Sequence, residues 1–117
     1  MASVGIIILS TFPSEESIAN VANKVVERRL CACVNFTRVR SIYSWRGKLK
    51  DEQEFIALFK TTPRSARKLT AEIARLHPYK VPEIVELKMG SVSNPYLSWL
   101  VDSTNGIPKK RHDAAKR

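Results

Sequence analysis

The chain has 117 residues and a mass of 13.2 kDa, which suffices for one domain with a modest hydrophobic core. Its content of 44% hydrophobic and 26% charged residues is typical of a globular protein and excludes a disordered or fibrous chain. No apolar run approaches the roughly 18 residues of a membrane span. The first apolar run lacks the flanks of a secretory signal, so we expect a cytoplasmic protein without a membrane anchor.

The net charge of +9 is typical of a nucleic-acid-binding protein, but the position of the charge along the chain argues against this interpretation. Residues 106–117 hold five basic side chains and one acidic side chain, which is almost half of the excess. In the rest of the chain, basic and acidic residues alternate along the predicted helices. We therefore expect one domain over residues 1–105 and a solvated, disordered basic tail over residues 106–117. Nucleic-acid binding by the tail is the minor alternative.

The N-terminal part of the chain predicts a strand followed by a helix. Val4–Ser10 is a short, continuous apolar run, typical of a strand that is covered on both faces. Pro13 and Ser14 begin the helix, with Ser14 as N-cap and acidic residues in the first turn, where they favour the helix dipole. One apolar stripe at helical spacing, expected to pack on a sheet, consists of Ile18, Val21, Ala22, Val25 and Leu30.

The next segment predicts a long β-hairpin. Apolar residues alternate from Ala32 and then fall out of phase, which indicates a bulge or bend near Thr37–Val39. Arg46-Gly47 forms a tight turn, because glycine supplies a permissive backbone. The return strand runs over about Leu49–Lys60, so we expect the polar tip of the hairpin to stand beyond the body of the domain.

The second half predicts a helix, a strand and a short final helix. Pro63 lies in the first turn of the helix, and His77-Pro78 ends it. Ile84–Met89 alternates apolar and charged residues, as a strand with one solvated face does. Asn94-Pro95 begins the final helix. The helices are expected to pack through Ala66, Leu69, Ile73 and Leu76, and through Tyr96, Leu97, Trp99 and Leu100.

The order β-α-β-β-α-β with a C-terminal helix predicts an α+β fold, the ferredoxin-like sandwich, in which two helices cover one face of a four-stranded antiparallel sheet. Phe55–Phe59 is apolar without alternation, so both faces of this strand need cover, and the two helices supply one. Burial of a large apolar side chain contributes about 1.5–3 kcal/mol, so the bare face is expected to drive self-association. The alternative is that the final helix, with Tyr96 and Trp99, folds over this face.

Cys31 and Cys33 are the two cysteines of the chain. If both lie on one strand, their spacing directs both side chains to the same face, which is a poor geometry for a mutual disulfide. We therefore expect reduced thiols. They are either a thiolate clip suited to Cu(I) or two small buried residues where a helix ends and a strand begins.

Five sequence features follow one another, without large gaps, from about Val4 to Ser103. They are Cys31-Ala-Cys-Val-Asn35, Ser41-Ile-Tyr-Ser-Trp-Arg-Gly-Lys48, Glu54 with Lys60-Thr61-Thr62, His77-Pro-Tyr-Lys-Val-Pro-Glu83 and Tyr96-Leu-Ser-Trp-Leu100. Together they resemble the CutA family of divalent-cation tolerance proteins. The resemblance implies a ferredoxin-like fold, a tight homotrimer similar to the PII signalling proteins, a cytoplasmic role in metal-ion tolerance, and no assigned reaction.

The copper site of some bacterial family members does not carry over to this chain. The resemblance implies that those members bind copper through three ligands, which are one cysteine just after the first strand and two adjacent histidines before Pro-Tyr. This chain has Ser10, Leu76 and His77 at these positions, so one of three ligands is present. For His77 the alternative to metal binding is that it closes a helix C-terminus. The remaining candidate ligands for copper or another divalent metal are His77 with Glu83, and Cys31 with Cys33.

Residues that match the family pattern on the hairpin have two interpretations. The first is packing between subunits, with Tyr43 and Trp45 as anchors and with Glu54 and Lys60 in partly buried ion pairs. The second is a pocket at the subunit boundary that takes an anion or a small ligand, as PII-like trimers do. The candidates for such an interface or pocket are Tyr43, Trp45, Lys48, Glu54, Lys60, Tyr96 and Trp99.

The sequence therefore predicts a trimeric regulator that responds to metal ions or binds them. A trimer that senses a small ligand or acts as a scaffold, without a metal role, is the alternative. An enzyme is the weakest option, because the chain has two histidines, His77 and His112, and lacks the G-x-S-x-G, P-loop and H-E-x-x-H motifs.

Overall fold

The computed structural model describes residues 4–104, and the tail expected over residues 106–117 lies outside them. The described chain forms a single four-stranded antiparallel sheet and three helices, in the order that the sequence predicts. The elements are β1 (Ile6–Phe12), α1 (Glu15–Glu27), β2 (Cys33–Trp45), β3 (Lys48–Thr61), α2 (Pro63–Leu76), β4 (Ile84–Lys88) and α3 (Asn94–Ser103).

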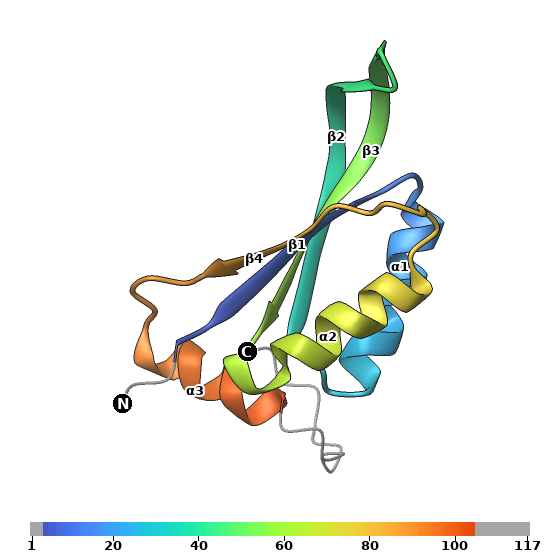
Figure 1. Cartoon of the computed structure of the whole chain (residues 1–117). Coiled ribbons are helices and arrows are strands. Elements are labelled where there is room, and N and C mark those ends of the chain that lie inside the picture. The colour runs from blue at the N-terminus through green and yellow to red at the C-terminus, as the bar shows by residue number, and fades with distance from the viewer. Residues whose placement is uncertain (1–3, 105–117) are drawn as a thin grey trace.

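The sheet has the strand order β2-β3-β1-β4, with α1 and α2 side by side on one face (Figure 1). This arrangement is the ferredoxin-like α+β fold, and it confirms the predicted fold class. The hairpin of β2 and β3 extends well past the ends of the other strands (Figure 1). Its outer residues are exposed on both sides, because no helix reaches them. Within residues 4–104, no helix is long and apolar enough to cross a membrane.

Local sequence signals explain where the first helix and the hairpin turn form. Ser14 caps α1 with a capping box. Its Oγ accepts a hydrogen bond from the Ser17 N–H, and its own backbone N–H donates to the Ser17 Oγ. At the hairpin tip, Arg46 and Gly47 both have positive φ, at 51° and 76°, between the paired residues Trp45 and Lys48. These angles belong to a two-residue type I′ turn, whose twist matches that of the strands.

The bulge expected near Thr37–Val39 is absent. The β2–β3 register is unbroken from Cys33 opposite Lys60 to Trp45 opposite Lys48. The apolar pattern of β2 slips for another reason. Near its start Val34 packs against the helix-side core, whereas further along Tyr43 and Trp45 lie on the other face, beyond the reach of the helices.

The core lies between the sheet and the two long helices. Its sheet-side residues occupy alternate positions of β1 and β3, such as Ile8, Phe12, Ala57 and Phe59, and each of these is fully buried. The helices contribute Ile18, Val21 and Val25 from α1 and Ala66, Leu69 and Ile73 from α2.

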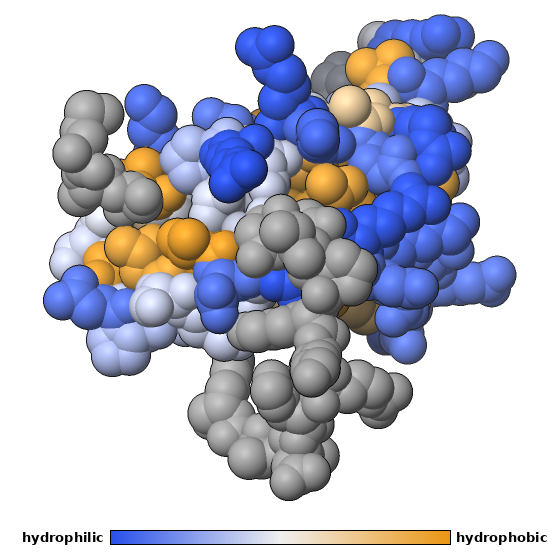
Figure 2. All heavy atoms as spheres, turned by 90° about the horizontal axis from the view of Figure 1, so that it is seen from below, coloured by the Kyte–Doolittle hydropathy of each residue, from blue (hydrophilic) through white to orange (hydrophobic). Residues whose placement is uncertain are grey.

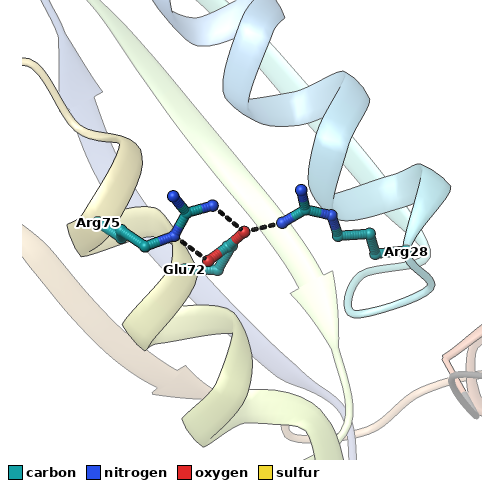
Figure 3. A network of polar contacts seen from close by, with 3 residues as sticks. All are labelled: Arg28, Glu72 and Arg75. Atoms are coloured by element: carbon teal, nitrogen blue, oxygen red, sulfur yellow. Dashed lines mark hydrogen bonds and ion pairs between the residues drawn. The ribbon is translucent and has the colours of Figure 1, made fainter.

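The two helices are also joined at their solvent side by a polar contact. The Glu72 carboxylate of α2 accepts from the Arg28 guanidinium at the end of α1, and from Nε and a terminal nitrogen of Arg75, each at 2.7 Å (Figure 3). The contact ties the C-terminal parts of α1 and α2 together.

The other face of the sheet carries a row of apolar side chains that no helix of the described chain covers. Among its residues, Val85 and Leu87 are 40% and 42% exposed. We call this surface the open face; it consists of Ile7, Leu9, Ile56, Leu58, Val85 and Leu87, which the strand register places on one side of the sheet.

The final helix does not cover the open face, so this alternative is wrong. Helix α3 lies at the end of the sheet where β1 begins and β3 ends (Figure 1). There Leu100 packs near Gly5, and Thr104 bonds to Thr62 and Ser65 at the start of α2. Seen from below, polar side chains cover the side of α1 and α2, and an apolar patch lies on the side of α3 (Figure 2).

Candidate functional site

A pocket of about 820 Å³ lies beside the hairpin, next to the loop that joins α2 to β4. One side of the pocket comes from the sheet and the outer part of β2, and the other from the loop. The lining residues are Thr11, Ser41, Ile42, Tyr43, Trp45, Arg46, Glu54, Tyr79, Lys80, Val81 and Glu83. The volume is within the range of about 300–1,000 Å³ typical of small-molecule sites.

The loop is held against the sheet by His77, the residue that ends α2. Its ring stacks on Phe12 with centroids 4.3 Å apart, and Nε2 lies 2.8 Å from the Thr11 carbonyl oxygen. Nδ1 accepts the Tyr79 N–H at 3.1 Å, so the proton of the neutral ring is on Nε2, which donates to Thr11. Burial lowers the pKa of His77, although the Thr11 carbonyl and the charge of Glu54 oppose this.

Glu54 joins the hairpin to the same loop. The carboxylate belongs to a residue only 6% exposed, and its Oε2 accepts the Tyr79 hydroxyl at 2.7 Å. Burial, and then this hydrogen bond to Glu54, raises the pKa of Tyr79 far above its ordinary value. The phenol therefore stays protonated and donates to Glu54 at neutral pH.

The outer part of the pocket is aromatic. The Arg46 guanidinium lies 5.7 Å from the centre of the Trp45 ring, within the range of a cation–π contact. The Tyr43 hydroxyl donates to Glu52, and this hydrogen bond is the main cause that raises the pKa of Tyr43 to about 12. Both side chains are partly exposed, at 44% for Trp45 and 38% for Tyr43, so they are available for contact with another molecule.

Comparison with known proteins identifies the family of this chain. The family model of the CutA1 divalent ion tolerance protein matches residues 6–103. The chain belongs to the CutA family. Its curated relative from Thermotoga maritima, the divalent-cation tolerance protein CutA, is 41% identical over 98 residues, which cover 84% of this chain and 97% of the relative.

Solved CutA structures share the fold. CutA from Synechococcus elongatus superposes with a TM-score of 0.85 at 32% identity, covering 89% of this chain and 93% of the other. The structure of the periplasmic divalent cation tolerance protein CutA from Archaeoglobus fulgidus has a TM-score of 0.83 at 27% identity, covering 86% and 99%. The family model and the Thermotoga maritima relative are named for ion or cation tolerance and not for an enzymatic reaction.

In this CutA family protein, the structure brings together only part of the predicted site. Tyr43, Trp45, Glu54 and Glu83 line one pocket, and His77 supports it from behind. The other candidates lie elsewhere: Lys48 is exposed at the hairpin tip, Lys60 pairs with Cys33 at the opposite end of the hairpin, and Tyr96 and Trp99 contact each other on α3.

The two cysteines do not form the expected same-face strand pair. Cys31 precedes β2 and is fully buried in the helix-side core, whereas Cys33 is the first residue of the strand, opposite Lys60 on the open-face side. The Cys31 thiol donates to the Cys33 carbonyl oxygen at 3.2 Å, and burial raises its pKa to about 12. Neither cysteine forms a disulfide in this structure.

A metal centre built from a single chain does not fit the described residues. Within residues 4–104, no three His, Cys, Asp or Glu side chains gather into a group that could hold a metal ion. Both ring nitrogens of His77 already have partners, and Glu83 is exposed at the pocket edge. A deeply buried thiol such as Cys31 is also a poor ligand, because metals bind the thiolate.

The sequence prediction missed Tyr79, although it lies in the quoted loop. Its partner Glu54 is 25 residues away in the chain, so spacing could not join them. The sequence did contain a weak indication. A tyrosine in a loop bounded by two prolines is held in place, and its hydroxyl needs a hydrogen-bond partner when it is buried. Thr11, Ser41 and Lys80 also line the pocket without a distinguishing pattern.

Proposed function

We propose that this CutA family protein is a cytoplasmic homotrimer that takes part in the response to metal ions. The open face is the observation that carries the proposal. Apolar residues from three neighbouring strands lie on one side of the sheet there; those of β1 and β3 are partly buried, and Val85 and Leu87 of β4 are 40% and 42% exposed. An apolar row that neighbouring elements leave partly in water is a common mark of an interaction surface, and burying it between copies stabilises an assembly.

The assembly can be tested by placing a charge on the open face. Leu87→Lys changes a residue 42% exposed on β4, and it is expected to lower the mass of the particle in light scattering. Val26→Lys is a matched control, because Val26 is 38% exposed but lies on α1, away from the open face. If Leu87→Lys keeps the mass of the unchanged protein, the open face is not the contact surface.

We place the metal role between subunits, since one chain does not supply a ligand set. Symmetry brings copies of one residue together in an oligomer. Glu83 is the candidate ligand best suited to this arrangement, because it is exposed at the pocket edge. The cysteines and His77 remain the other candidates.

Binding calorimetry with Cu(I), Cu(II) and Zn(II) tests the metal role. Saturable binding is expected for at least one ion and is expected to weaken in Glu83→Gln. The Cys31→Ser, Cys33→Ser double variant distinguishes a thiolate site from a site at Glu83, because only a thiolate site would lose its metal in this variant. If no ion binds more tightly than about millimolar, which corresponds to about 4 kcal/mol, the proposed metal role is wrong.

The pocket favours a second candidate function, the binding of a small ligand without a metal role. The lining combines apolar and aromatic residues with a few polar groups that could orient a ligand. A change such as Trp45→Ala is expected to abolish ligand binding while the trimer persists. Loss of the trimer in this variant would instead assign Trp45 to subunit packing.

A further inference from the structure

Glu54 is a buried carboxylate without a cation partner among residues 4–104. The ion pairs of the described residues join Arg28 and Arg75 to Glu72, and Arg40 to Asp51. Glu54 takes part in none of them, and its side-chain hydrogen bond comes from the neutral Tyr79 hydroxyl. A carboxylate in a residue only 6% exposed is usually paired with a positive charge, because burial without one is costly.

The cationic side chains near Glu54 do not supply this charge within residues 4–104. His77 is held neutral, because its Nδ1 accepts the Tyr79 N–H. Lys80 and Arg46 line the same pocket but are exposed, and the Arg46 guanidinium lies over the Trp45 ring. Among residues 4–104, the position beside Glu54 is therefore open to a cation from elsewhere.

The surroundings of Glu54 suit an organic cation better than a metal ion. Tyr43, Trp45 and Tyr79 line the pocket together with Glu54, and aromatic faces attract ammonium groups. A divalent metal needs several oxygen or nitrogen ligands, whereas the carboxylates that line this pocket are Glu54 and Glu83. An ammonium needs one buried carboxylate and an aromatic enclosure.

We propose that this pocket binds a small organic molecule that carries a primary ammonium group. The ammonium donates to Glu54, and the apolar part of the molecule lies against Tyr43 and Trp45. Arg46 and Lys80 are placed to contact an anionic group at the outer end, as in an amino-acid-like ligand. This inference rests on the second candidate function above, and it names the class of ligand.

Benzylammonium and benzyl alcohol are matched probes, since they share the ring and differ in the charged group. Binding is read from the indole N–H signals of the two tryptophans in a ¹H–¹⁵N spectrum of the full-length protein. Benzylammonium is expected to shift the Trp45 signal saturably and to leave Trp99 on α3 unchanged. Benzyl alcohol is expected to bind at least about tenfold more weakly, which corresponds to about 1.4 kcal/mol.

Glu54→Gln keeps the shape of the side chain and removes its charge. It is expected to weaken benzylammonium at least about tenfold and to leave benzyl alcohol unchanged. Glu86→Gln is the control, because Glu86 is exposed on the helix side of β4, away from the pocket.

Two results overturn the proposal. The first is an equal response to both probes, or none, at Trp45. The second is dissociation of Glu54→Gln into monomers in light scattering, which would show that a cation of a second copy pairs with Glu54. Neither result depends on calorimetry with metal ions or on the Leu87→Lys variant, so this proposal can fail while the trimer and the metal role stand.

Discussion

The Tyr79 hydroxyl donates to Glu54 Oε2 at 2.7 Å, which connects the loop after α2 to the base of the projecting hairpin. Removing this hydroxyl leaves a buried carboxylate without its donor. Tyr79→Phe is therefore expected to lower the free energy of unfolding by about 1 kcal/mol, measured by urea denaturation at fixed protein concentration.

Tyr43→Phe is the matched control for this change. Tyr43 also donates to a glutamate, but its hydroxyl and Glu52 are both in solvent, where water replaces a lost bond. Little change in stability is expected. If the two variants lose the same free energy of unfolding, the Tyr79–Glu54 hydrogen bond stabilises the fold no more than an exposed one does.

His77 makes stability depend on pH. Its folded pKa lies below the ordinary value of 6.5, so the unfolded chain binds the proton more readily than the folded one. The stability due to neutral His77 is complete above pH 6.5 and is lost as pH falls below it. Urea midpoints between pH 7.5 and 5.5 should decline, and less so in His77→Gln; parallel declines would contradict the assignment of this effect to His77.

Two buried hydroxyls are expected to respond in opposite ways to removal. The Ser10 Oγ has no hydrogen-bond partner among residues 4–104, so Ser10→Ala should leave the free energy of unfolding unchanged or raise it by up to about 1 kcal/mol. The Thr61 hydroxyl donates to the Leu30 carbonyl at 2.7 Å, so Thr61→Val should lower it by about 1 kcal/mol. Thermal or urea unfolding measures both, and a clear loss in Ser10→Ala would contradict the pattern.

Cys31 is expected to resist alkylation in the folded protein. It is fully buried, and burial raises its pKa to about 12, so almost no thiolate exists at pH 8. Iodoacetamide treatment followed by peptide mass spectrometry should find Cys31 unmodified until the protein is unfolded in urea. Rapid alkylation of Cys31 in the folded protein would show that the thiol is accessible, and Cys31 would again be a candidate metal ligand.

Much of the fold followed from local signals. The capping serine Ser14, the turn glycine Gly47 and the helix-opening Pro63 each have a conformational reason to be where they are, and the structure places each as predicted. The lack of alternation in Phe55–Phe59 also indicated two covered faces. In the structure Phe55, Ala57 and Phe59 face the helices, and Ile56 and Leu58 belong to the open face.

The error on β2 has a physical origin. Apolar periodicity reports which side of a strand is covered, and it loses meaning where a strand leaves the body of the domain. The predicted bulge rests on Val39, Ile42 and Trp45, which fall out of phase because Ile42 lies on the helix side of the sheet and the other two lie on the opposite side. The register of β2 is nevertheless regular. The cysteine spacing misled in a similar way, because Cys31 precedes the strand to which it was assigned.

The candidate site was less predictable than the fold. Family resemblance directed attention to the hairpin and to the loop after α2, and four of the named residues do line one pocket. The bonds that organise the pocket join residues far apart in sequence, as His77 with Thr11 and Tyr79 with Glu54 do. Periodicity and spacing carry no information about such contacts.

The mass of the full-length protein in solution tests the central claim most directly. Light scattering coupled to size-exclusion chromatography, at micromolar protein, is expected to give three times the 13.2 kDa of the chain. That result would agree with an open face that is buried between copies. A particle of 13.2 kDa would contradict the account, because the apolar surface of β1, β3 and β4 would then be left in water.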